Sequence, residues 1–320
     1  MRSVIIKIVI SFIIVLATHL VLAFLANGTT DQYYQKFTLK SSPNLILGTS
    51  RASQGLNPVF FNDILEENDF QNFAFTLKSS SYGEVYFNAV KEKTKRIDSG
   101  GCFILSIDPW CISQEKGKTI NSSDSSSVLF GINHFDQKPN FEYLWKKFPY
   151  GWGMIAFRNF EKFILKANYR YFNENVNGSF AQVAPDGYLR VYPSLDSLFV
   201  VKKEIRTFRE YEKKTHQMVF SEERFYYLAK LIDLLKSKGE VYLVRLPVHK
   251  TMLEIEEDYL AGFNSHISTL LTKADGYFDL IEAPLDNVYI DGNHLYSESA
   301  TKVSQYLATE IKRFRNADTY

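Results

Sequence analysis

The sequence predicts an α/β domain, a three-layer sandwich on a mostly parallel five-stranded sheet, preceded by one N-terminal transmembrane helix. Two observations support this fold class. A mostly apolar run covers residues 4–26, and about 20 apolar residues suffice to span a bilayer. Beyond it, short apolar runs that suit buried strands alternate with helix-like segments. That alternation is typical of parallel sheets with right-handed crossovers.

The apolar run contains one charged residue, Lys7. Arg2 and Lys7 lie at its N-terminal end, so the positive-inside rule places the N-terminus in the cytoplasm and the domain outside, in the periplasm or at the cell surface. A cleaved signal peptide is the alternative. The run is longer than a signal-peptide core of about 7–15 residues, and its best small-x-small site, Ala26 to Gly28, is poor. We expect an uncleaved anchor.

Composition excludes several function classes. The chain carries 37 basic and 36 acidic residues, without the basic excess of nucleic-acid binders. Its two cysteines, Cys102 and Cys111, form no disulfide framework, and no Cys/His spacing resembles a zinc site. A Cys102–Cys111 bridge would need an oxidising compartment and a chain reversal at Pro109. We expect Cys102 to be a buried small apolar residue, and we expect no metal, no organic cofactor and no nucleic-acid partner.

The elements of the first half follow in order after a polar linker at residues 27–42, where the domain of residues 43–320 begins. Apolar runs predict strands at residues 44–48, 70–75 and 102–107. Pro58 suits the start of a short helix ending at Glu66. Ser81 and Glu84 have capping-box spacing, which predicts a helix through Lys95. Residues 113–217 break the alternation, and we interpret them as an insertion that covers or extends the site.

The second half returns to regular alternation. Ser221 is a suitable N-cap for a helix and Gly239 a suitable residue beyond its end. Strands are expected at residues 241–246 and 277–281, with a helix between them at residues 259–271. Ser297 can cap the last helix. The apolar stripes of the first and last of these helices comprise Phe225, Leu228, Leu231, Ile232 and Leu235, and Ala300, Val303, Leu307 and Ile311.

Two short segments at opposite ends of the domain carry chemistry. Gly48-Thr49-Ser50-Arg51 follows the first strand, and Asp291-Gly292-Asn293-His294 precedes the last helix. Ligands of open parallel sheets bind at the carboxyl ends of the strands, where both segments would lie. A serine becomes a nucleophile when a base takes its proton and a third group orients that base. Ser50, His294 and Asp291 supply these three types.

These motifs, G-x-S after the first strand and D-x-x-H before the final helix, resemble the SGNH (GDSL-like) hydrolase superfamily, whose sheet is flavodoxin-like. The resemblance implies that Ser50 is the nucleophile, His294 the general base and Asp291 its orienting carboxylate. The phrases LILGTSRASQGLNP and YLVRLPV resemble membrane-anchored, cell-envelope members. Such members act on acyl groups of surface polymers, often beside a multispanning membrane acyltransferase.

The chain departs from the family pattern at the oxyanion hole. Asn72 matches the family's second block, but the glycine that follows it in the family is Leu77 here, whose backbone N–H can still donate. Asp108 stands where the family has an asparagine donor, and an ionised carboxylate cannot donate to an oxyanion. Arg51 either contacts an anionic substrate or has no part in the chemistry, as a salt-bridged or solvated side chain; the sequence does not choose between them.

The expected function is therefore an extracytoplasmic serine esterase or O-acyltransferase acting on an acylated polysaccharide or a similar polymer. The alternative is a catalytically degenerate domain that binds a polymer or scaffolds a membrane acyltransferase. The two differ in geometry, because the enzyme requires Ser50 Oγ within hydrogen-bond reach of His294.

Overall fold

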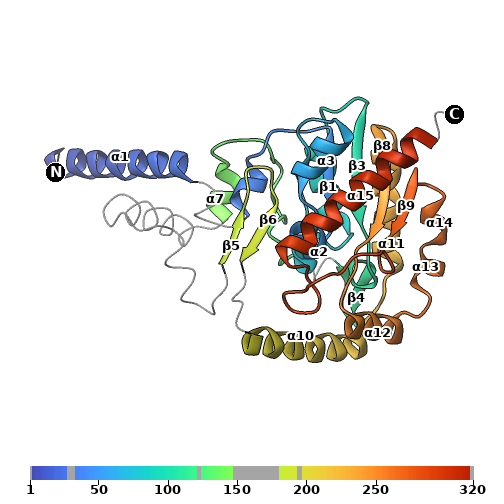
Figure 1. Ribbon diagram of the computed structural model, residues 1–320. Helices are drawn as coiled ribbons and strands as arrows, with labels where there is room; N and C mark the ends of the chain where they lie inside the picture. The colour runs from blue at the N-terminus through green and yellow to red at the C-terminus, as the bar shows by residue number, and fades with distance from the viewer. Residues whose placement is uncertain (1, 27–32, 121–123, 147–179, 193–196, 318–320) are drawn as a thin grey trace.

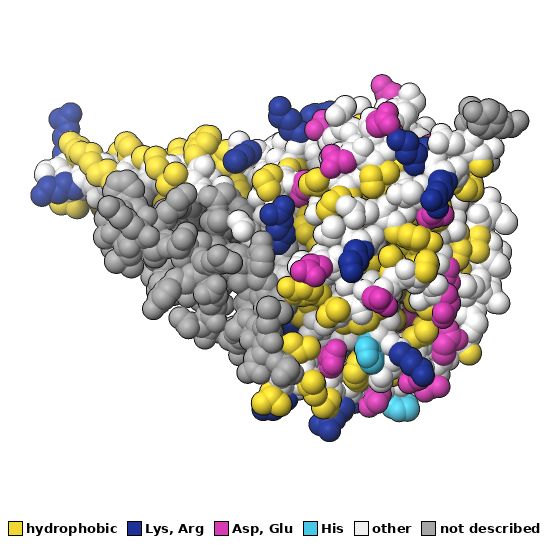
Figure 2. Space-filling view, viewed as in Figure 1, with side chains coloured by type: hydrophobic (Ala, Val, Ile, Leu, Met, Phe, Trp, Pro, Cys, Tyr) yellow, Lys and Arg dark blue, Asp and Glu magenta, His cyan; other side chains and the backbone are white. Residues whose placement is uncertain are grey.

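The computed structural model describes residues 2–26, 33–120, 124–146, 180–192 and 197–317. Helix α1 (Arg2–Leu25) is the one helix in these ranges that is long and apolar enough to span a bilayer. It projects from the domain (Figure 1), and its apolar side chains form an exposed sleeve with basic residues at the free end (Figure 2). Only at its C-terminal end does it meet the core, through Ala23.

The predicted parallel sheet is present. Its strands are β1 (Asn44–Leu47), β2 (Gln71–Asn72), β3 (Gly101–Ser106), β8 (Gly239–Arg245) and β9 (Gly276–Asp279). They pair in the order β2-β1-β3-β8-β9, and every pairing is parallel. The chain therefore runs outward from β1 in one direction to β2 and, through β3, in the other. That is the order of doubly wound sheets.

Helices cover both faces of the sheet. Alternate strand residues point to opposite faces, so Leu45 and Leu47 enter one core while Ile46 enters the other. The first core packs against α5 (Glu84–Lys93) and α11 (Glu222–Lys236). The second lies under α2 (Ser50–Gly55), α3 (Pro58–Leu65) and α15 (Ser297–Ala317), which crosses the front of the sheet in Figure 1.

Several predicted helix features are present. Ser221 caps α11 and accepts a hydrogen bond from Arg224 N. Helix α15 begins where predicted, but Ser297 is its first residue and not the residue that caps it. The predicted stripe of α15 is buried throughout, and that of α11 is buried except for Phe225, which is partly buried.

Two predicted helix boundaries are wrong. Ser81 does not form a capping box with Glu84, because the N-cap of α5 is Gly83. Ser81 is instead the C-cap of the short helix α4 (Leu77–Ser80), and its hydroxyl donates to Leu77 O. Gly239 does not follow the end of α11, which is capped by Ser237. It opens β8 instead, where a Cβ would lie 1.9 Å from the carbonyl oxygen of Gly101. Close strand approach, not helix termination, requires this glycine.

The helix predicted at residues 259–271 is broken into two short helices, and the strand predicted at residues 70–75 is reduced to two residues. Helix α12 (Lys250–Tyr259) ends where a helix was expected to begin. Gly262, with a φ of 67°, then separates it from the short helices α13 (Phe263–His266) and α14 (Ser268–Leu271).

The segments outside the sheet have structure of their own. In the predicted linker, η1 (Tyr34–Phe37) packs into the domain. Within residues 113–217, part of the aromatic stretch lies outside the described residues. The described part holds α7 (Phe141–Lys146), α10 (Ser197–Gln217) and a hairpin of β5 (Phe180–Val183) and β6 (Leu189–Tyr192). It also holds β4 (Ser113–Glu115), which pairs antiparallel with β7 (Met218–Phe220), just after the region.

Candidate active site

The site lies at the point where the strand order reverses. The connections of β1 and β3 leave in opposite directions, and such switch points form a crevice beyond the carboxyl ends of the strands. Ser50 follows β1 as the first residue of α2. Between them, Gly48 has a φ of 135°, and a Cβ there would lie 2.9 Å from Ser106 Cβ. A glycine is therefore required for the tight turn that delivers Ser50.

The structure brings Ser50, His294 and Asp291 together. Ser50 Oγ lies 2.8 Å from His294 Nε2. His294 Nδ1 lies 3.0 Å from each carboxylate oxygen of Asp291. Asp291 Oδ1 also accepts the backbone N–H groups of Asn293 and His294, at 3.1 and 2.9 Å. The carboxylate therefore fixes both the imidazole and the loop that carries it, and the three groups stand in the order nucleophile, base and orienting group.

Electrostatics keeps Asp291 ionised. Burial alone would raise the pKa of this carboxyl, but the charge and hydrogen bond of His294, with help from Lys203, outweigh burial and hold the pKa at about 2. Lys203 Nζ stands 3.9 Å from Asp291 Oδ2. An ionised Asp291 only accepts hydrogen bonds, so it favours the imidazole tautomer with its proton on Nδ1. Nε2 is then the acceptor that faces Ser50.

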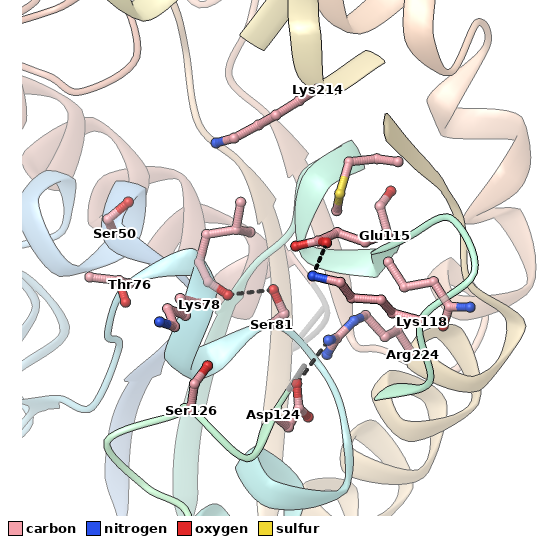
Figure 3. A pocket seen from close by; sticks show the side chains of 14 residues that line it. Ser50, Thr76, Lys78, Ser81, Glu115, Lys118, Asp124, Ser126, Lys214 and Arg224 are labelled. Atoms are coloured by element: carbon pink, nitrogen blue, oxygen red, sulfur yellow. Dashed lines mark hydrogen bonds and ion pairs between the residues drawn. The ribbon is translucent and has the colours of Figure 1, made fainter. Parts of the chain in front are cut away.

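A cavity of about 570 Å³ opens in front of Ser50. Figure 3 shows Thr76 and Lys78 near Ser50 on one side and Lys214, from α10, reaching toward them from above. Hydroxyl, amide and charged side chains make up most of its lining, so it suits a polar ligand. Helix α10, within the region of residues 113–217, thus contributes to the site.

Arg51 points away from this cavity. It is 6% exposed, and its guanidinium donates to Glu256 Oε1 at 2.5 Å and to Asn293 Oδ1 at 2.6 Å. Both partners belong to the protein and bury the guanidinium. Of the two roles left open by the sequence, the structure favours the salt bridge, and substrate contact by Arg51 is not supported.

Glu256 is the centre of this buried group and was missed by sequence reasoning. It is fully buried, and it accepts hydrogen bonds from Arg51, from Trp110 Nε1 at 2.9 Å and from Arg245 at 3.3 Å. It lies on α12, the helix that was not predicted. One signal was present: Glu256 is four residues from the buried Met252 and therefore on the same helix face.

Asp108 acts as a hydrogen-bond acceptor, not as an oxyanion donor. Its Oδ1 caps the turn η2 (Pro109–Ile112) by accepting from Trp110 N and Cys111 N, each at 2.9 Å. Its Oδ2 accepts from Thr49 Oγ1 at 3.5 Å. The side chain is buried and does not line the cavity. The side chain thus serves the local backbone and the Arg51 guanidinium, whose Nη1 lies 3.9 Å from Asp108 Oδ2.

Asn72 is likewise structural. Its Nδ2 donates to Ala52 O and Leu56 O, each at 2.9 Å, and so ties β2 to α2. Its Oδ1 accepts from Ala74 N and from Lys36 Nζ. Beyond β2, Phe73 N still donates to Ile46 O of β1 at 2.8 Å, whereas Ala74 N is bonded to the Asn72 side chain.

Leu77 remains the oxyanion candidate that the geometry allows. It lines the cavity together with Ser50. As the first residue of α4, it has a backbone N–H without an acceptor inside its helix.

Lys36 is a second group that the sequence did not reveal. It lies in η1, is fully buried, and donates to Ser53 Oγ at 3.1 Å, to Asn72 Oδ1 at 3.2 Å and to Ala74 O. Burial lowers its pKa to about 7, although Asp186 opposes this. The segment that follows α1 is thus connected to Ser53 of α2, the helix that carries Ser50.

No metal-like cluster of three or more His, Cys, Asp or Glu occurs in the residues that the structure describes. Cys102 and Cys111 are both buried and free, so the alternative of a bridge between them is not realised. Comparison of the chain with family models, with curated proteins and with solved structures gives no match.

Proposed function

We propose that this chain is a membrane-anchored serine esterase or O-acyltransferase of the SGNH type, acting on ester-linked acyl groups of a cell-envelope polysaccharide or similar polymer. The observation that carries the proposal is the hydrogen-bonded chain from Ser50 Oγ through His294 to Asp291, placed at the mouth of a polar cavity. The doubly wound sheet supports it, since the three residues lie at its switch point.

The geometry supports the following reaction. Ser50 Oγ attacks the acyl carbonyl carbon while His294 Nε2 takes the hydroxyl proton. The backbone N–H of Leu77 donates to the oxyanion. The tetrahedral intermediate collapses when His294 returns the proton to the departing alkoxide, which leaves the acyl group on Ser50. Water as the second nucleophile gives hydrolysis, and a sugar hydroxyl gives transfer; His294 takes the proton of either, and Ser50 departs with it.

Helix α1 sets the proposed location. It is apolar along its length, with Arg2 and Lys7 near its start, so the positive-inside rule puts the N-terminus in the cytoplasm and the domain outside. An enzyme held there meets polymers of the envelope. A multispanning membrane acyltransferase is the proposed partner if the reaction is transfer, because it would deliver acyl groups across the same membrane.

The second candidate function is a degenerate domain that binds such a polymer or scaffolds the acyltransferase. Asp108 favours it. Because this carboxylate caps η2, it supplies no side-chain donor to an oxyanion. Loss of one such donor costs about 10²- to 10³-fold in rate in other enzymes, which would weaken catalysis without abolishing it.

Fluorophosphonate labelling separates the two functions. The full chain in detergent micelles is treated with a fluorescent fluorophosphonate and compared with Ser50→Ala and Ser81→Ala. Ser81 lines the same cavity, but its hydroxyl donates to a backbone carbonyl instead of a histidine. The enzyme is expected to label in the wild type and in Ser81→Ala, and not in Ser50→Ala. A folded wild type that resists labelling would leave the binding or scaffold function.

A further inference from the structure

The cavity in front of Ser50 carries more positive than negative charge. Four cationic side chains line it, Lys78, Lys118, Lys214 and Arg224, against the two carboxylates of Glu115 and Asp124. Lys118 pairs with Glu115, and Arg224 pairs with Asp124 at 2.8 Å. Within the described residues, Lys78 and Lys214 have no carboxylate at ion-pair distance. These two lysines are also the ones that Figure 3 places nearest to Ser50.

The ammonium group of Lys214 is partly desolvated, but no carboxylate among the described residues lies in contact with it. It is half-buried, and its Nζ rests 4.0 Å from the centre of the Tyr211 ring. Burial lowers its pKa; Glu210 and Asp108 counteract this, while Arg51 adds to it. Desolvating a charge is costly unless an opposite charge compensates. A ligand that brings a negative group into the cavity would supply that compensation.

Helix α10 is held firmly enough for Lys214 to be a defined contact. The Tyr211 hydroxyl lies 3.3 Å from Asn293 Nδ2, and its ring packs 4.9 Å from that of Trp110. Further along the helix, Lys203 stands beside Asp291. One face of α10 therefore lies against the catalytic loop. Lys214 extends from this face toward a site whose other wall carries Lys78, on α4.

We propose that Lys78 and Lys214 bind an anionic group, a carboxylate or a phosphate, next to the acyl ester that Ser50 attacks. The substrate is then an acylated acidic polymer rather than a neutral glycan. Thr76, Ser81 and Gln114, which also line the cavity, supply the neutral hydrogen-bonding groups that sugar hydroxyls need. This inference rests on the proposed function, because it names the substrate of the same site.

Protection of Ser50 from the fluorophosphonate tests the inference. The full chain is labelled in low salt in the presence of polygalacturonate, of inorganic polyphosphate or of neutral dextran. At least one polyanion is expected to slow labelling about tenfold or more at concentrations where dextran has no effect. The polymer that protects identifies the anion as a carboxylate or a phosphate. Because the contacts are electrostatic, protection should weaken as salt is added.

The variants assign the effect to the two lysines. Lys78→Gln/Lys214→Gln should lose the protection, measured as the ratio of this variant's own labelling rates with and without the polyanion. The matched control is Lys202→Gln/Lys213→Gln, which removes two positive charges from exposed positions of α10 outside the cavity and should keep it. Protection by neither polyanion, equal protection by dextran, or equal loss in the control would each overturn the inference.

Equilibrium binding keeps this test separate from the proposed function. Fluorescent polygalacturonate and polyphosphate are titrated against the Ser50→Ala chain, which has no nucleophile. Binding of a polyanion that falls at least tenfold in the added Lys78→Gln/Lys214→Gln background supports the anionic site, whether or not the wild type labels. Absence of labelling alone rejects the enzyme, whereas absence of lysine-dependent binding alone rejects the anionic site.

Discussion

Two clusters of polar side chains lie side by side at the carboxyl edge of the sheet, and they behave in opposite ways. The open cluster, Ser50, His294 and Asp291, reaches the cavity through Ser50, with the partly buried His294 behind it. The buried charge cluster, Arg51, Asn293, Glu256 and Asp108, is closed to solvent. The chain alternates between them: Ser50 precedes Arg51, and Asn293 precedes His294. Each short motif thus supplies one residue for chemistry and one that anchors the loop carrying it.

Local geometry explains the division. Successive residues of a helix point about 100° apart, so Ser50 and Arg51 at the start of α2 must face different surroundings. The Arg51 guanidinium donates to Asn293 from Nε at 3.0 Å and from Nη2 at 2.6 Å. This contact ties the nucleophile helix to the histidine loop across the domain. The buried charge cluster thereby holds Ser50 and His294 at hydrogen-bond distance, and the open cluster needs that distance for proton transfer.

The largest expected effect belongs to the open cluster. Asp291→Asn should lower the rate of fluorophosphonate labelling by about 10⁴-fold, since an amide in place of the carboxylate favours the wrong imidazole tautomer. Its fold should persist, as judged by circular dichroism. Asp286→Asn, an exposed position in the same loop, is the matched control and should label normally. Labelling of Asp291→Asn within tenfold of the wild type would contradict the triad.

The buried charge cluster should respond in stability. Glu256→Gln leaves Arg51 and Arg245 buried without their common counter-charge, and breaking such a pair costs about 3–5 kcal/mol. We expect a fall in the midpoint of thermal unfolding of roughly 5–8 °C. Glu257→Gln, which removes a half-exposed carboxylate 3.7 Å from the same Arg245, should cost less than about 1 kcal/mol. Equal falls in the unfolding midpoint of the two variants would show that the buried Glu256 contributes no more to stability than the exposed Glu257.

Acid should weaken the open cluster in a defined range. The pKa of Asp291 is about 2 in the fold and about 3.9 in an unfolded chain. The ionised carboxylate therefore contributes about 2–3 kcal/mol to the free energy of unfolding. This contribution is complete above the pKa of the unfolded chain and is lost as the pH falls through the pKa of the folded one. Between pH 5 and 2.5, Asp291→Asn should lose less unfolding free energy than the wild type in urea titrations. If the unfolding free energies of both proteins fell equally between pH 5 and 2.5, Asp291 would not be the group responsible.

The sequence predicted the parts of the molecule that depend on local pattern. Apolar runs located the strands of the sheet, and the cap Ser221 follows from hydrogen-bonding rules that act within one turn. Ser50 and His294 were found because their motifs adjoin such elements. Glu256 and Lys36 were missed because each is a charge in the core, which composition rules place outside. Their partners lie far away along the chain, at Arg51 and Asn72 respectively.

Lys36 offers the smallest and most specific test of how these clusters are supported. Lys36→Met should cost about 1–3 kcal/mol of unfolding free energy, because Asn72 Oδ1 and Ala74 O lose a buried donor. The pKa of Lys36 is about 7 in the fold and about 10.4 unfolded. The unfolded chain therefore binds more protons between these values, and wild-type stability should rise with pH there by at most about 1.4 kcal/mol per unit.

Urea unfolding at pH 7 and pH 9 measures both effects of Lys36. The variant should be less stable than the wild type at each pH, and its stability should increase less between them. Lys40→Met, at an exposed position of the same segment, should change neither quantity. If Lys36→Met kept the wild-type pH slope, the lysine would not be the titrating group. If Lys36→Met also lowered the labelling of Ser50, η1 would position the open cluster through α2 in addition to stabilising the fold.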